Sequence, residues 1–160
     1  MAIYCEWEGV EGNVTAEGYE KHIGVLSCDF GVSRAISMEA GNVSNRESSR
    51  PNLSEITLTK MADNSCTALF KEAVTGSAGK KVNIKFVRTG ADKVQEFMSY
   101  TLENALVSSY SISADAENEP VERISISYSK MMVNYNDHDD SNKSGSPQRV
   151  GYDVKLAKSL

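Results

Sequence analysis

Histidine, cysteine, proline and long apolar runs are all scarce in this chain of 160 residues. The only histidines are His22 and His138, and neither adjoins a Ser or Cys in a nucleophile motif, so a hydrolase triad is not supported. The run of residues 137–140 contains metal-ligand types but lacks the spacing of a calcium loop, and we interpret it as a solvated loop. The sequence therefore predicts a protein without catalytic residues, metal or cofactor.

The three cysteines, Cys5, Cys28 and Cys66, cannot all be paired in disulfides. Each lies at an apolar position, which favours buried free thiols in a reducing compartment. Residues 1–8 contain neither a basic segment nor a long apolar run, so we expect no cleaved signal peptide and no membrane-spanning segment. Synthesis is thus predicted to end in the cytoplasm.

An excess of basic charge is also missing, because 17 Lys and Arg residues stand against 22 Asp and Glu residues, for a net charge of -5. Without a basic patch, neither a nucleic acid nor an anionic membrane is an expected partner. The length and the 40% hydrophobic content are enough for one core. We therefore predict a single domain over residues 1–160.

One stretch, residues 63–76, has apolar residues with a period near 3.6 and predicts the single α-helix, at about 64–76. Its apolar stripe consists of Cys66, Leu69, Phe70, Ala73 and Val74. A residue between Asp63 and Ser65 can cap its start, and Gly76 can end it. We expect the helix to bury this stripe against strands, because so short a helix depends on tertiary packing.

Alternation of apolar and polar residues predicts strands elsewhere in the chain. The predicted strands cover residues 3–8, 22–33, 55–59, 82–86, 95–113, 124–132 and 150–156. The strand 95–113 is so long that we expect a bend or bulge at 103–105, and it resembles one arm of a hairpin with 124–132. In 22–33, the residues Leu26, Cys28, Phe30 and Val32 share the predicted core face. Ser27, Asp29 and Ser33 then lie on the opposite, small and polar face.

A polar run at about residues 38–53 follows neither hydrophobic period and is longer than most connections in compact domains. Two interpretations stay open, a surface excursion and an arm that becomes ordered on a partner subunit. The residues proposed to contact a neighbouring subunit are Glu39, Asn42, Arg46, Glu47 and Arg50.

Four motifs in the same order along the chain resemble one family. They are Val-Leu-Ser-Cys-Asp-Phe-Gly-Val-Ser at 25–33, Leu-Thr-Lys at 58–60, Leu-Val-Ser-Ser at 106–109 and Gly-Tyr-Asp-Val-Lys at 151–155. Together they are similar to the haemolysin-coregulated protein (Hcp) family, the tube subunits of bacterial type VI secretion. The resemblance implies a two-sheet β-barrel or sandwich flanked by one helix.

The resemblance also implies a hexameric ring whose stacked copies form the inner tube that a contracting sheath expels, with a spike protein at its tip. Small effector proteins would travel in the lumen, and the subunit would be secreted without a cleaved signal peptide. The same resemblance places Ser27, Asp29 and Ser33 on the wall of the lumen. Two alternatives remain: a non-catalytic β-sandwich module that binds a carbohydrate or peptide, and an enzyme fused to a tube protein.

Overall fold

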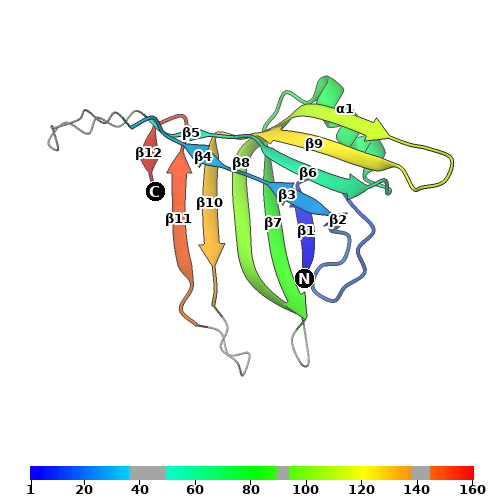
Figure 1. Cartoon of the computed structure of the whole chain (residues 1–160), viewed down its shortest axis with the longest axis horizontal. Coiled ribbons are helices and arrows are strands. Elements are labelled where there is room, and N and C mark those ends of the chain that lie inside the picture. Colours follow the sequence, from blue (N-terminus) through cyan, green and yellow to red (C-terminus); the bar gives the residue numbers. More distant parts are fainter. Residues whose placement is uncertain (37–49, 90–93, 138–144) are drawn as a thin grey trace, which may run out of the picture.

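The computed structural model describes residues 1–36, 50–89, 94–137 and 145–160, which form a mainly β fold with one short helix (Figure 1). Its strands are β1 (Ala2–Trp7), β2 (Ile23–Val25), β3 (Ser27–Asp29), β4 (Val32–Ser33), β5 (Asn52–Leu53), β6 (Ile56–Met61), β7 (Lys80–Thr89), β8 (Val94–Ser113), β9 (Val121–Ser127), β10 (Lys130–Tyr135), β11 (Gln148–Asp153) and β12 (Lys158–Ser159), and its helix is α1 (Cys66–Thr75). The predicted mainly β fold with a single helix is confirmed.

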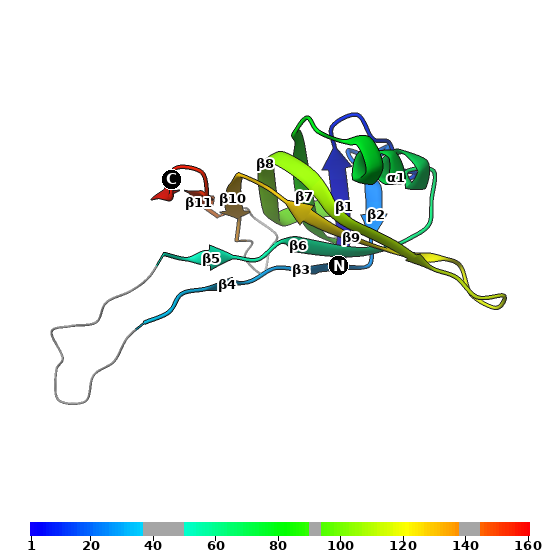
Figure 2. The ribbon, with the colours of Figure 1, turned by 90° about the horizontal axis from the view of Figure 1, so that it is seen from above.

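Two antiparallel sheets share strand β8. The first has the order β12-β11-β10-β8-β7-β1-β2, and the second has the order β3-β6-β9-β8. A separate ribbon of β4 and β5 continues away from the second sheet (Figure 2). Within the described ranges the sheets stay open instead of closing into a barrel, so the sandwich form of the prediction is the correct one.

Strand β8 passes from one sheet to the other at the predicted irregularity. Its first half pairs with β7 and β10, and its second half pairs with β9. The β7 register shifts between the partners Leu102 and Ala105, and Asn104 has a φ of 55°. A Cβ atom on Gly79 would lie 2.6 Å from the Asn104 Cα, so this close approach requires glycine. The predicted bulge at 103–105 and the β8–β9 hairpin are both confirmed.

The core lies between the two sheets and beneath α1. Alternating residues of β1, β6, β7 and β9 are buried there, as the period of two predicts. The core residues of these strands are Ile3, Cys5, Trp7, Ile56, Leu58, Val82, Ile84, Phe86, Ile124 and Ile126. Their neighbours in sequence point away, so each sheet has one apolar and one more polar face.

The helix covers less of the sheet than its apolar stripe predicts. Leu69 is fully buried, but Phe70 and Val74 are 57% and 64% exposed. The helix starts within two residues of the predicted position, with Ser65 as N-cap, and the Asp63 carboxylate accepts a hydrogen bond of 2.8 Å from the Ser65 amide. Phe70 contacts the Tyr110 ring of β8 but stays mostly exposed, as does Val74, so the predicted burial of these two residues is wrong.

The predicted strand at residues 22–33 is divided into β2, β3 and β4. Its Cys28 and Phe30 are half-buried against the core, but Leu26 and Val32 are 58% and 61% exposed, so their predicted burial is wrong. Leu26 lies between β2 and β3, where its amide still donates to the Thr59 carbonyl at 2.7 Å. Val32 lies beyond the edge of the core, in the ribbon that β4 forms with β5.

Two further expectations need correction. The predicted strand at 150–156 corresponds to β11, which ends at Asp153, and Val154 and Leu156 lie in an exposed turn before β12 instead of alternating within a strand. Of the three free cysteines, Cys5 is buried, but Cys28 and Cys66 are only half-buried. Burial raises the pKa of the Cys5 thiol to about 12, with a smaller contribution from Cys28.

Candidate functional site

The outer face of the second sheet carries two rows of mostly hydroxyl side chains. Strand register places Ser27, Thr59, Arg123 and Ser111 in one row, and Asp29, Thr57, Ser125 and Ser109 in the other. Residues directly opposite each other in antiparallel strands share a face, so all eight point away from the core. The structure therefore extends the predicted polar face from one strand to four. We call it the hydroxyl face.

The hydroxyl face is held in place by the core residues that alternate with it. On the reverse side of the sheet, Cys28 lies opposite Leu58, which lies opposite Ile124, and the last two are buried. The Thr57 and Ser125 hydroxyls lie 3.4 Å apart. Because these side chains are short, the face offers many hydrogen-bonding groups with little apolar area.

The predicted site residues do not all lie together. Ser27 and Asp29 belong to the hydroxyl face, half-buried and exposed respectively. Ser33 lies in the β4–β5 ribbon opposite Asn52 and is exposed outside the two rows. Sequence reasoning missed Arg123, although it lies between the core positions Glu122 and Ile124, so the period of two could have placed it on this face.

The predicted subunit arm is described only at its base. Glu39, Asn42, Arg46 and Glu47 lie outside the residues that the structure describes. Arg50 is exposed and is followed by Pro51 and then β5. The part of residues 38–53 that is described includes the strand β5, which sequence reasoning assigned to the loop.

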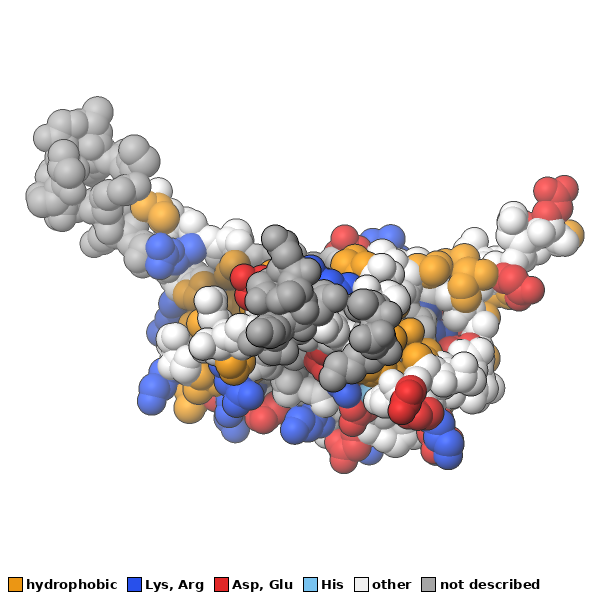
Figure 3. Space-filling model, turned by 90° about the horizontal axis from the view of Figure 1, so that it is seen from below, with side chains coloured by type: hydrophobic (Ala, Val, Ile, Leu, Met, Phe, Trp, Pro, Cys, Tyr) orange, Lys and Arg blue, Asp and Glu red, His pale blue; other side chains and the backbone are white. Residues whose placement is uncertain are grey.

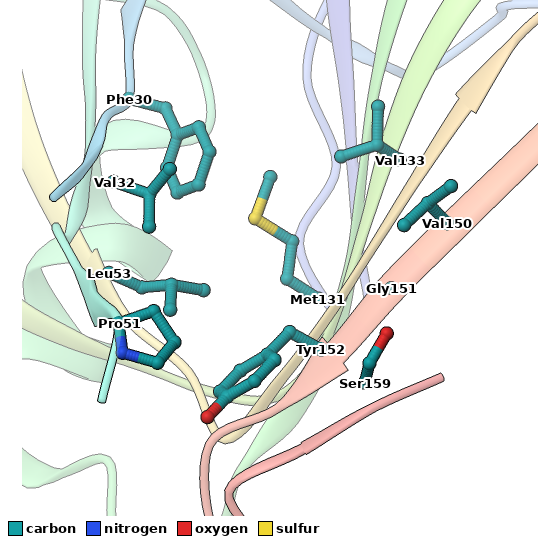
Figure 4. A pocket seen from close by; sticks show the side chains of 10 residues that line it. All are labelled: Phe30, Val32, Pro51, Leu53, Met131, Val133, Val150, Gly151, Tyr152 and Ser159. Carbon is teal, nitrogen blue, oxygen red and sulfur yellow. The ribbon is translucent and has the colours of Figure 1, made fainter. Parts of the chain in front are cut away.

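An apolar groove lies between the β4–β5 ribbon and the strands β10 and β11 (Figure 4). Its volume is about 250 Å³. Phe30, Val32 and Leu53 form one wall, and they face Met131 and Val150 on the other. No sequence pattern predicted this groove, because its two walls come from segments that lie far apart in the chain.

A second apolar surface lies where α1 crosses the β8–β9 hairpin. The exposed residues Phe70 and Ile112 line it, together with Tyr110. The Phe70 ring packs against the edge of Tyr110, with ring centroids 6.1 Å apart. Burial raises the Tyr110 pKa to about 12, and the Glu122 carboxylate contributes to this shift.

A buried ionic cluster joins the start of α1 to the hydroxyl-face sheet from the inside. Lys60 Nζ lies 3.0 Å from Asp63 Oδ1 and 3.2 Å from Glu122 Oε1, and it donates to the Met61 carbonyl at 2.9 Å. The Ser65 hydroxyl donates to the same Asp63 oxygen. Each charge has a partner of opposite sign inside the protein, although Glu122 Oε2 is buried without a hydrogen-bond partner, so the cluster connects elements of the fold.

The described ranges contain no group of three or more side chains suited to hold a metal ion. They also contain no helix with the length and apolar character needed to cross a membrane.

The chain was compared with models of protein families, with curated proteins and with solved structures. The family model described as type VI secretion system effector, Hcp, matches residues 4–135. A search of curated proteins gave no match.

Three solved structures illustrate the likeness in fold. A type six secretion system protein superposes with a TM-score of 0.92 at 24% identity, covering 99% of each chain. A type VI secretion system effector from Yersinia pestis gives 0.76 at 16% identity, covering 95% of this chain and 99% of that one. Hcp1 from Salmonella typhimurium gives 0.74 at 22% identity, covering 99% and 98%. Since the family model spans most of the sequence and the fold agrees over nearly its whole length, the chain belongs to the Hcp family of type VI secretion proteins.

Proposed function

We propose that this chain is a non-enzymatic tube subunit, which forms a hexameric ring whose copies stack into the inner tube of a type VI secretion system. The observation that carries this proposal is the match to the Hcp family over residues 4–135. The hydroxyl face supports it, because a tube needs one broad polar surface per subunit that can face a water-filled bore.

In this proposal the hydroxyl face lines the lumen. Its Ser and Thr side chains keep the bore hydrated and offer hydrogen bonds to an effector that must also be released. Asp29 and Arg123 lie in neighbouring rows, so each subunit contributes one negative and one positive charge to this wall. Charges of both signs allow weak contacts with effectors of varied composition without strong retention of any one.

A sheath and a spike protein are also proposed partners of the tube. A sheath would surround the ring, and a spike protein would close the tip of the tube. The proposed contacts with a neighbouring subunit remain Glu39, Asn42, Arg46, Glu47 and Arg50, and Ser33 remains a proposed lumen residue.

Replacing residues 42–50 by a short Gly-Ser linker should leave the body folded, because surface loops add little to stability, but should stop assembly and secretion.

Light scattering after gel filtration tests the ring. We expect a particle six times the 17.5 kDa chain mass at micromolar concentration. A particle of 17.5 kDa would contradict a stable ring and favour a monomeric β-sandwich binding module.

A further inference from the structure

The apolar groove is too exposed to be explained by the fold of one chain. Val32 and Val150, on opposite walls, are 61% and 63% exposed. The groove volume of about 250 Å³ suits a few small apolar side chains. Apolar surface of this kind gains stability when a partner covers it.

Two arginines flank the ribbon wall of this groove. Arg34 and Arg50 are exposed and lie within two residues of the lining residues Val32 and Pro51. Among the described residues, neither arginine forms an ion pair with a carboxylate. A partner for this surface should therefore combine apolar side chains with negative charge.

The tip of the β8–β9 hairpin has these properties. Residues 114–120 read Ala-Asp-Ala-Glu-Asn-Glu-Pro, with three carboxylates and no cation. The Asp115 carboxylate accepts hydrogen bonds of 2.9 Å from the amides of Glu117 and Asn118, which fixes the shape of the tip. Asp115, Glu117 and Glu119 are exposed and form no ion pair with any described cation. Small apolar residues alternate with these acids.

The tip and the groove lie at opposite ends of the molecule, so one chain cannot bring its own tip to its own groove. Figure 2 shows the β4–β5 ribbon at one end of the long strands and the hairpin at the other. Figure 3 shows acidic side chains at the hairpin end, and basic and apolar side chains at the base of the ribbon. Two different surfaces at opposite ends form a heterologous contact, which can repeat along one direction.

We propose that the apolar groove between the β4–β5 ribbon and β10–β11 receives the acidic tip of the β8–β9 hairpin from a second copy of this chain. The copies are placed end to end along the strands of the hydroxyl-face sheet. The carboxylates of the tip lie against Arg34 and Arg50, and Ala114, Ala116 or Pro120 enters the groove. This contact rests on the proposed function, in which it would join successive rings of the tube.

Disulfide trapping tests the contact directly. Asn118→Cys at the tip and Asn52→Cys at the ribbon change no charge, and Cys28→Ser with Cys66→Ser removes the accessible thiols. Cys5 can remain because it is fully buried. We expect mild oxidation to join copies into covalent multimers, found only in particles larger than a single ring. A matched control pairs Asn118→Cys with Ser77→Cys, an exposed residue after α1, and should give no multimers.

Charge reversal tests the recognition. Glu117→Lys with Glu119→Lys should lower the yield of multimers by about tenfold, which corresponds to about 1.4 kcal/mol, because the substitutions replace attraction to the arginines by repulsion. Adding Arg34→Glu and Arg50→Glu should restore most of the yield. The control variant Glu11→Lys with Glu17→Lys changes the net charge equally and should leave the yield unchanged.

Two results would overturn the contact: no multimers from the tip and ribbon cysteines, or multimers within particles of single-ring mass. A yield that reversal of the tip charges does not change would overturn the recognition of the groove by the acidic side chains of the tip. Light scattering on the same samples separates the proposed ring from the proposed contact between tip and groove. If rings form but the cysteines are not joined, only the contact is refuted. If multimers are trapped from chains that form no rings, only the ring is refuted.

Discussion

The ammonium group of Lys60 lies 3.2 Å from the carboxylate of Glu122, and both side chains are fully buried. Lys60 belongs to β6 and Glu122 to β9, which pair directly at these two residues. Lys60 also binds Asp63 just before α1, so the cluster connects the helix with two strands of the second sheet. Loss of one partner leaves a buried charge without compensation.

We expect Lys60→Met to destabilise the fold by about 3 to 5 kcal/mol, because Glu122 would stay buried without its cation. Chemical denaturation of the purified protein measures this loss. The double variant Lys60→Met with Glu122→Leu should recover the part of the stability lost through Glu122, while Asp63 loses its cation but keeps its hydrogen bonds from Ser65. Equal losses in the single and double variants would show that the pair matters only through its packing.

Adjacent helix residues should respond in opposite ways to truncation. Leu69→Ala should cost about 2 to 5 kcal/mol of unfolding free energy, because it leaves a cavity in the core. Phe70→Ala should cost much less, since 57% of Phe70 is exposed in the single chain. A large loss for Phe70→Ala alone, measured by denaturation of the dilute monomeric chain, would mean that the helix is rotated from its observed position.

The buried thiol of Cys5 should make stability decrease in alkaline solution. Burial raises the Cys5 pKa from 9.0 to about 12, so the folded chain keeps a proton that the unfolded chain loses. Between these two values the unfolding free energy should decrease by about 1.4 kcal/mol per pH unit from this group. Comparison of the protein with Cys5→Ala from pH 7 to 11 isolates this contribution. Parallel pH profiles for the two would contradict it.

Asp29→Arg tests the hydroxyl face without disturbing the core. Because Asp29 is exposed, the variant should fold and keep its oligomeric state. The charge of the proposed lumen wall would change by two units per subunit, so the set of proteins that copurify with the ring should change. Glu17→Arg, at an exposed carboxylate outside the hydroxyl face, changes the charge by the same two units and serves as the control. An unchanged set of copurifying proteins and unchanged secretion would speak against a lumen role.

The alternation of residues in the sequence was enough to predict most strands and the bend of β8. It places Ile3, Cys5 and Trp7 on one buried face, as the structure confirms. It also identifies Ser27 and Asp29 as a polar face, because their neighbours of opposite parity lie toward the core. Periodicity predicts which residues share one face of a strand, and in these strands the apolar face is buried in the core.

Periodicity does not predict whether another element packs on an apolar face, and the wrong predictions of burial arise for this reason. Phe70, Val74 and Val32 have the correct spacing for burial but lie beyond the edge of the core. Conversely, Lys60 and Glu122 are charged yet buried, because they occupy core positions of their strands and pair with each other. The groove and the full hydroxyl face depend on the pairing of distant strands, which single-strand patterns do not specify.

Cryo-electron microscopy of the purified protein tests the central claim most directly. We predict a closed ring of six chains whose bore is lined by the hydroxyl face, with Asp29 and Arg123 of every chain exposed to it. A reconstruction with isolated chains, or with rings in which the hydroxyl face points outward, would contradict the account.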